Sequence, residues 1–222
     1  MSRATDGEAY FVVGSRGAGK TEWTMQQTHK ATRLLVWDAV QQWSKRGLVQ
    51  PVWSIDQLKD AVVADMRAPG RFRIGYAGPI SITLPRKPPL QPMVVPLFPV
   101  FCKIAWAWLR RRPGSTLVVE ELADVTQPGK APPAWGDIVR KSRHESHSRV
   151  FALTQRPAES DKTIAGNADV IHCGRLSLPR DRQSMAQYLD VPVTEVTRLE
   201  SLQYLERDMR THRLQRGTVK FS

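Results

Sequence analysis

The sequence predicts an α/β fold with a mostly parallel sheet and helices on both of its faces. Short apolar runs that favour strands alternate along the chain with stretches that favour helices, an order typical of parallel sheets. At 222 residues the chain is long enough to bury a full hydrophobic core. We therefore expect a single domain over residues 1–222, preceded by a polar tail at 1–8 and completed by a β-hairpin at 203–222.

A phosphate-binding motif of the form G-x-x-x-x-G-K-[ST] occurs near the N-terminus. It consists of Gly14, Ser15, Arg16, Gly17, Ala18, Gly19, Lys20 and Thr21. The apolar run at 9–13 suits a buried strand and the run at 22–27 suits a helix, which is the context that the motif requires. Backbone N–H groups of such a loop bind phosphates, together with the helix dipole. We expect Lys20 to reach the β- and γ-phosphates of ATP and the Thr21 hydroxyl to bind Mg²⁺.

Two adjacent acids follow a second apolar run further along the chain. The segment 115–119 predicts a buried strand, and Glu120 and Glu121 come directly after it. In nucleoside triphosphatases the first acid of such a pair holds Mg²⁺ and the second polarises the attacking water. The first position usually carries Asp, and Glu120 has a longer side chain. We assign the metal to Glu120 and the water to Glu121, and the reverse assignment stays open.

Apolar periodicity predicts the remaining strands and helices. Continuous or alternating apolar runs indicate strands, and apolar residues at helical spacing indicate helices. Besides the two strands above, strands are expected at 33–38, 71–76, 149–155 and 169–173. Helices are expected at 54–66, 99–112, 137–144 and 181–189. The segments 203–210 and 214–221 alternate like the arms of a hairpin.

Other segments lack such a pattern. Residues 79–92 are rich in Pro and residues 125–135 in Pro and Gly, so both are expected to be irregular loops. A further connection at 39–52 carries Trp43 and is followed by Trp53. We expect both tryptophans to be packing anchors rather than platforms for nucleic-acid bases.

The charge balance favours a polyanionic partner. The chain has 33 Lys and Arg against 21 Asp and Glu, a formal net charge of +12. Nucleic acid is the first candidate and an anionic membrane surface the second, with plain solubility as the alternative. The most apolar run, 93–109, is interrupted by proline and lysine and is too short to span a bilayer. We expect it to contribute a core helix, so no spanning segment is predicted.

The order of these motifs resembles a known superfamily. After the loop, the paired acids and a basic helix, an apolar strand ends in Thr154, Gln155, Arg156 and Pro157, and similarity continues through 164–169 and 181–189. This order resembles the FtsK–HerA superfamily of DNA-pumping ATPases. The resemblance implies a RecA-like sheet and makes Gln155 a polar sensor near the γ-phosphate. It also implies an arginine that reaches a neighbouring subunit's nucleotide, with Arg143 as the first match and Arg140 as the second.

Within that superfamily the chain, because it is small and lacks a membrane segment, most resembles the genome-packaging ATPases of tailless icosahedral viruses with an internal membrane. This resemblance implies double-stranded DNA as partner and a homo-oligomeric ring of five or six subunits. It also implies portal or vertex proteins near a membrane, and a location at the packaging vertex of the virion and in the host cytoplasm. The loop 125–135 would project towards the DNA channel, which makes Lys130 a DNA-contacting residue.

Several alternatives remain from the sequence. A filamentous-phage assembly ATPase, similar to zonular occludens toxin, is the nearest. A P-loop kinase of a small metabolite would explain Lys20 and Thr21 but not the acid pair, Gln155 or the positive charge. A nucleotide-binding switch without turnover is a third. His144, His147 and His172 have no cysteine pair at zinc spacing, so we expect no metal there.

Overall fold

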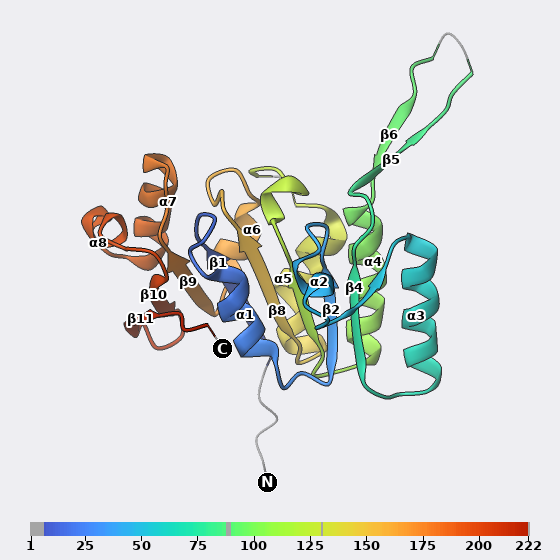
Figure 1. The fold of residues 1–222 in the computed structure, drawn as a ribbon, viewed down its shortest axis with the longest axis horizontal. Coiled ribbons are helices and arrows are strands. Elements are labelled where there is room, and N and C mark those ends of the chain that lie inside the picture. The colour runs from blue at the N-terminus through green and yellow to red at the C-terminus, as the bar shows by residue number, and fades with distance from the viewer. Residues whose placement is uncertain (1–6, 88–89, 130, 222) are drawn as a thin grey trace.

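The computed structural model describes residues 7–87, 90–129 and 131–221, and these residues form a sheet that is mostly parallel (Figure 1). In the described part of the chain this sheet has nine strands in the order β11-β10-β9-β1-β8-β7-β2-β4-β3. Its strands are β1 Glu8–Val13, β2 Arg33–Trp37, β3 Gln50–Val52, β4 Phe72–Tyr76, β7 Thr116–Val119, β8 Arg149–Thr154, β9 Val170–Gly174, β10 Gln203–Asp208 and β11 Leu214–Thr218. The predicted α/β class is thus confirmed.

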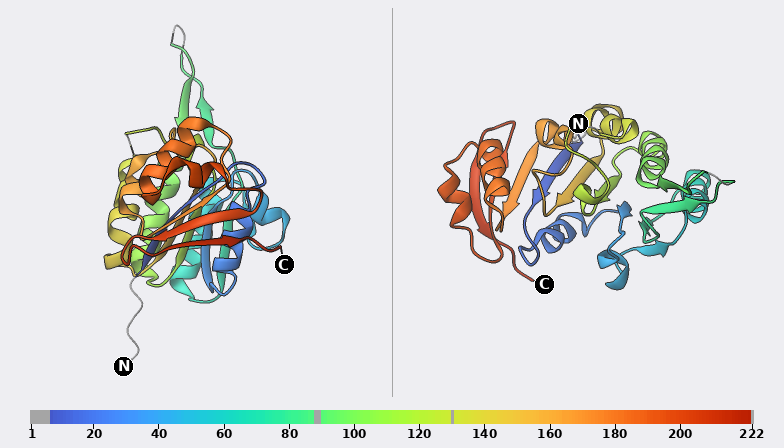
Figure 2. Two further views of the ribbon diagram at one scale, coloured as in Figure 1. Left: turned by 90° about the vertical axis from the view of Figure 1, so that its left-hand side faces the viewer. Right: turned by 90° about the horizontal axis from the view of Figure 1, so that it is seen from above.

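Helices pack on both faces of this sheet, as Figure 2 shows from above. Their bounds are α1 Lys20–Thr28, α2 Gln42–Lys45, α3 Ile55–Arg67, α4 Phe98–Arg111, α5 Pro133–Glu145, α6 Lys162–Asn167, α7 Pro179–Leu189 and α8 Val193–Thr197, with a 3-10 turn at Leu122–Asp124. One apolar cluster joins α1 and Trp43 to one face of the strands. In the larger cluster, the helices from α3 through α7 pack against the other face.

The register of the central strands sets the place of the site. β1 lies between β8 and β9 and pairs with β8 in parallel over its whole length. β7 pairs with β8 in parallel as well. The carboxyl ends of these strands therefore lie at one edge of the sheet, where ligands of open α/β sheets bind.

The C-terminal segment forms the predicted hairpin. β10 pairs antiparallel with β11 on one side and with β9 on the other, so the hairpin extends the main sheet. Residues 1–6 of the tail predicted at 1–8 lie outside the described residues, and Glu8 is already part of β1.

Two predictions about the connections were wrong. The Pro-rich segment 79–92 is not an irregular loop throughout, because β5 Ser81–Leu84 pairs antiparallel with β6 Met93–Pro96. Trp53 is 50% exposed and is no packing anchor, whereas Trp43 is fully buried as expected. Sequence periodicity also missed β3, α2, α6 and α8, which are too short to show a period. The helix expected at 137–144 begins earlier, at Pro133, because proline fits the first turn of a helix.

Candidate active site

The loop after β1 is folded as a phosphate cradle. Gly17 and Gly19 have φ of 77° and 88°, a region that favours glycine. A side chain at Gly14 would place its Cβ 2.9 Å from the Ala18 Cβ, so only glycine lets the loop close this tightly. The Gly14 N–H donates to the Thr154 carbonyl at 3.2 Å, which attaches the loop to the end of β8.

Lys20 begins α1 and lies beside the paired acids. Its side chain is buried, and its Nζ is 3.8 Å from Glu121 Oε1. Burial lowers the pKa of Lys20, while Glu121 and Glu120 act in the opposite direction. This buried ammonium group can bind a triphosphate, because charged phosphate oxygens would replace the hydration that burial removes.

Glu120 is the most enclosed member of the pair. It follows β7, is almost fully buried, and accepts a hydrogen bond at Oε1 from the Trp43 indole Nε1 at 2.9 Å. Burial raises the pKa of Glu120 to about 7, against the lowering effects of Trp43, Lys20 and the Thr21 hydroxyl. Among the described residues, its Oε2 is buried with no hydrogen-bond partner.

This unpartnered oxygen fits a divalent cation. A buried carboxylate oxygen without a donor is costly unless a cation or a water shell meets it. The hydroxyl group of Thr21, the last residue of the phosphate motif, lowers the pKa of the same carboxyl group. Glu120 and Thr21 would therefore hold Mg²⁺, which would neutralise phosphate charge when bound.

Glu121 and Gln155 form a second polar pair. Gln155 follows β8, and its Nε2 donates to Glu121 Oε1 at 2.7 Å. Glu121 has a φ of 48°, a conformation that is uncommon for a residue with a side chain and that turns the chain sharply after Glu120. The two adjacent acids thus separate, one into the buried contact with Trp43 and one towards Lys20 and Gln155.

Sequence reasoning missed two residues that organise Glu120. Asp38, at the end of β2, is buried and accepts hydrogen bonds from the backbone N–H groups of Trp43 and Ser44 at 3.2 and 2.8 Å. It thereby fixes the first turn of α2 and the position of the Trp43 indole. The signal in the sequence is an acid at the end of the strand predicted at 33–38, followed closely by a tryptophan that we expected only to be a packing anchor.

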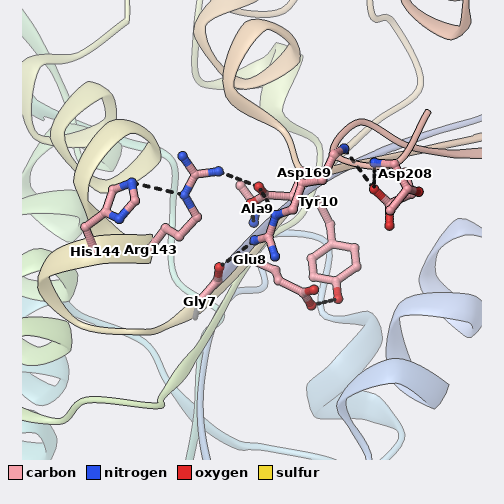
Figure 3. A network of polar contacts seen from close by, with 10 residues as sticks. Gly7, Glu8, Ala9, Tyr10, Arg143, His144, Asp169 and Asp208 are labelled. Carbon is pink, nitrogen blue, oxygen red and sulfur yellow. Dashed lines mark hydrogen bonds and ion pairs between the residues drawn. The ribbon is translucent and has the colours of Figure 1, made fainter. Parts of the chain in front are cut away.

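Arg143 lies away from this site. α5 runs against the direction of β8, so its last turn reaches the amino edge of the sheet, opposite to the phosphate loop. There Arg143 and Arg210 both bind Asp169, which also accepts the Ala9 N–H at 2.9 Å (Figure 3). Asp169 is buried, so this cluster gives Arg143 a structural role.

The other residues predicted to contact a ligand or a partner are exposed or lie outside the described residues. Arg140, one turn before Arg143, is half exposed and is 3.7 Å from Asp137. Arg16 is exposed on the loop. Lys130 lies outside the described residues.

Known proteins resemble this chain in sequence and in fold. No family model matches the chain. Protein P9 of Pseudoalteromonas phage PM2 is 31% identical over 194 residues, which cover 87% of this chain and 80% of that protein. The genome packaging NTPase B204 from Sulfolobus turreted icosahedral virus 2, in complex with AMPPCP, has a TM-score of 0.69 at 14% identity over 97% of this chain and 99% of its own. The bacterial conjugative coupling protein TrwB has a TM-score of 0.61 at 10% identity, and the match covers 100% of this chain and 86% of that protein's chain.

Proposed function

Because the chain belongs to the family of protein P9 of phage PM2 and has an FtsK–HerA-type P-loop ATPase fold, we propose that it hydrolyses ATP to move double-stranded DNA. We further propose that this movement packages a viral genome into a preformed capsid, and the similarity of the fold to that of the genome packaging NTPase B204 supports this role. One observation carries the proposal: the phosphate loop, Glu120, Glu121 and Gln155, from three neighbouring strands, meet at one edge of the sheet.

The proposed chemistry divides the work among these residues. The loop N–H groups and Lys20 bind the β- and γ-phosphates and stabilise the charge that develops during transfer. Glu121 accepts a proton from the attacking water, and Gln155 orients that water through its amide. Glu120 and Thr21 hold Mg²⁺. The 3.8 Å contact between Lys20 and Glu121 would open as phosphate takes the place of the carboxylate beside the ammonium group.

DNA and further subunits complete the proposal. A net charge of +12 supports binding to a polyanion, and Lys130 in the loop after the acid pair is the proposed DNA contact. One domain of this size cannot enclose a duplex, so we propose a homo-oligomeric ring of five or six subunits. An arginine from a neighbour would then stabilise the transition state. Arg140 is the better candidate, because Arg143 is held by Asp169.

The location follows from the same proposal. A packaging motor would act at a vertex of the virion, assembled from protein present in the host cytoplasm, and would contact portal or vertex proteins. Among the described residues, no helix has the length and apolar character needed to cross a bilayer.

The test is the rate of ATP hydrolysis with and without long double-stranded DNA. We expect Mg²⁺-dependent hydrolysis that DNA stimulates at low salt, with stimulation falling steeply as salt rises, because phosphate contacts release counterions. Lys130→Ala should weaken the stimulation while basal hydrolysis stays nearly unchanged. A rate that is the same with and without DNA at every salt concentration would refute DNA movement and favour a metabolite kinase.

A further inference from the structure

The hairpin formed by β5 and β6 stands away from the rest of the molecule. Figure 1 and the left view of Figure 2 both show it projecting beyond the helices at its base. Its two strands pair only with each other in the described sheets. An isolated two-stranded hairpin is marginally stable in water, so an element of this kind gains stability when another surface covers it.

This hairpin carries an unusual share of the exposed apolar surface. Of the twelve large apolar side chains that are exposed in the described part of the chain, six lie in this one segment: Ile80, Ile82, Leu84, Leu90, Met93 and Val94. The register places Leu84 opposite Met93 and Ile82 opposite Val95, and alternation puts these four on one face. The four side chains form one apolar stripe, and contiguous exposed apolar surface of this kind is typical of interaction sites.

The segment that carries this stripe has charges of one sign only. Between Asp65 and Glu120 the sequence contains no acidic residue. Arg86 and Lys87 lie at the turn, both exposed. The Arg86 Nη2 is 2.9 Å from the Met93 Sδ, so its guanidinium group folds back along the hairpin and borders the apolar stripe.

An apolar stripe bordered by cations, on a segment that carries no acid of its own, matches the interface of an anionic bilayer. Apolar side chains enter the boundary between headgroups and acyl chains, and arginine stays with the phosphates. DNA fits less well, because β5 and β6 themselves carry no cation along their length to neutralise successive phosphates. We propose that the β5–β6 hairpin docks side-on against the surface of an anionic lipid membrane and so tethers the protein there. This inference depends neither on ATP hydrolysis nor on DNA binding.

The experiment is flotation of the purified full-length protein with vesicles of phosphatidylcholine alone or mixed with phosphatidylglycerol. We expect binding to the mixed vesicles that persists in part at about 0.5 M salt, where charge alone is strongly screened. The double variant Ile82→Ser/Leu84→Ser should bind about tenfold more weakly and lose the salt-resistant part. Arg86→Gln/Lys87→Gln should weaken binding to mixed vesicles by about fivefold for each cation removed.

Matched controls separate the hairpin from the general positive charge. Val63→Ser/Val193→Ser changes two apolar side chains that are 41% and 44% exposed, against 40% for both Ile82 and Leu84, but lie on other elements. This control should bind vesicles like the unaltered protein, and all variants should keep the same thermal unfolding midpoint. The proposal is overturned if the hairpin and control variants bind equally. It is also overturned if the hairpin variant loses affinity for duplex DNA, or self-association, with vesicle binding unchanged.

Discussion

The indole Nε1 of Trp43 donates a hydrogen bond to Oε1 of Glu120 at 2.9 Å, and this contact joins α2 to the end of β7. Both side chains are almost fully buried. The contact therefore fixes one carboxylate oxygen and leaves the other, Oε2, without a hydrogen-bond partner among the described residues. Trp43 is a positioning residue for the proposed metal ligand.

Replacing Trp43 by Phe should weaken the use of Mg²⁺. Phenylalanine keeps part of the apolar contacts but removes the donor, so the buried carboxylate loses its orientation and part of its stabilisation. We expect the Mg²⁺ concentration for half-maximal hydrolysis to rise about tenfold, with ATP binding little changed. Trp53→Phe is the matched control, since Trp53 is exposed. An unchanged Mg²⁺ titration for Trp43→Phe would remove this role from Trp43.

The two acids should have separable functions. Glu121→Gln keeps the shape of the side chain but cannot accept a proton, so this variant should still bind ATP. It should hydrolyse ATP at least a hundredfold more slowly, because general-base catalysis contributes about 10²–10⁴-fold to a rate. Lys20→Ala should instead lose ATP affinity as well as hydrolysis. Binding of a fluorescent ATP analogue and the rate of phosphate release measure both effects. Full activity of Glu121→Gln together with an inactive Glu120→Gln would exchange the roles of the two acids.

The place of the phosphate motif and of the acid pair in the fold could be predicted from the sequence, whereas parts of their surroundings could not. The phosphate motif and the acid pair are local patterns whose neighbours in the chain dictate a strand end, so their convergence follows from parallel topology alone. Trp43 could not be assigned in the same way, because its partner Glu120 is distant in the chain and the four-residue helix that carries it shows no period. The hairpin at 81–96 was hidden for a related reason: its strands have four residues each and are bordered by prolines, which normally indicate a loop.

Buried His172 should make the protein less stable in mild acid. It stacks on Trp23 of α1 at 4.1 Å between ring centroids, and its Nδ1 contacts Glu206 at 3.1 Å. Burial lowers the pKa of His172, and Glu206 offsets this only in part. The unfolded chain therefore takes up a proton near pH 6.5, the ordinary value, while the folded protein does not.

It follows that the free energy of unfolding should fall as the pH drops below about 6.5 and level off below the folded pKa. His172→Phe keeps the aromatic stacking and removes the titrating group, so its unfolding free energy should depend less on pH between 5 and 7. Urea unfolding across this range measures the difference. His144→Phe is the control for a histidine outside the core. Equal pH dependence in all three proteins would assign the effect to other groups.

A neighbour's arginine can be identified by mixing inactive subunits. Lys20→Ala subunits cannot use ATP but still carry every arginine, whereas Arg140→Ala subunits keep an intact phosphate loop. If Arg140 serves the adjacent subunit, each variant should be inactive alone and a mixture should regain part of the rate, since an arginine supplied in this way contributes about 10³–10⁵ in rate. Arg143→Ala should behave differently, because it removes a partner of buried Asp169. We expect it to lower the unfolding midpoint and to show no rescue on mixing. The reverse result, with rescue for Arg143→Ala and full activity for Arg140→Ala, would mean that the Asp169 contact breaks in the ring and that Arg143 is the residue in question.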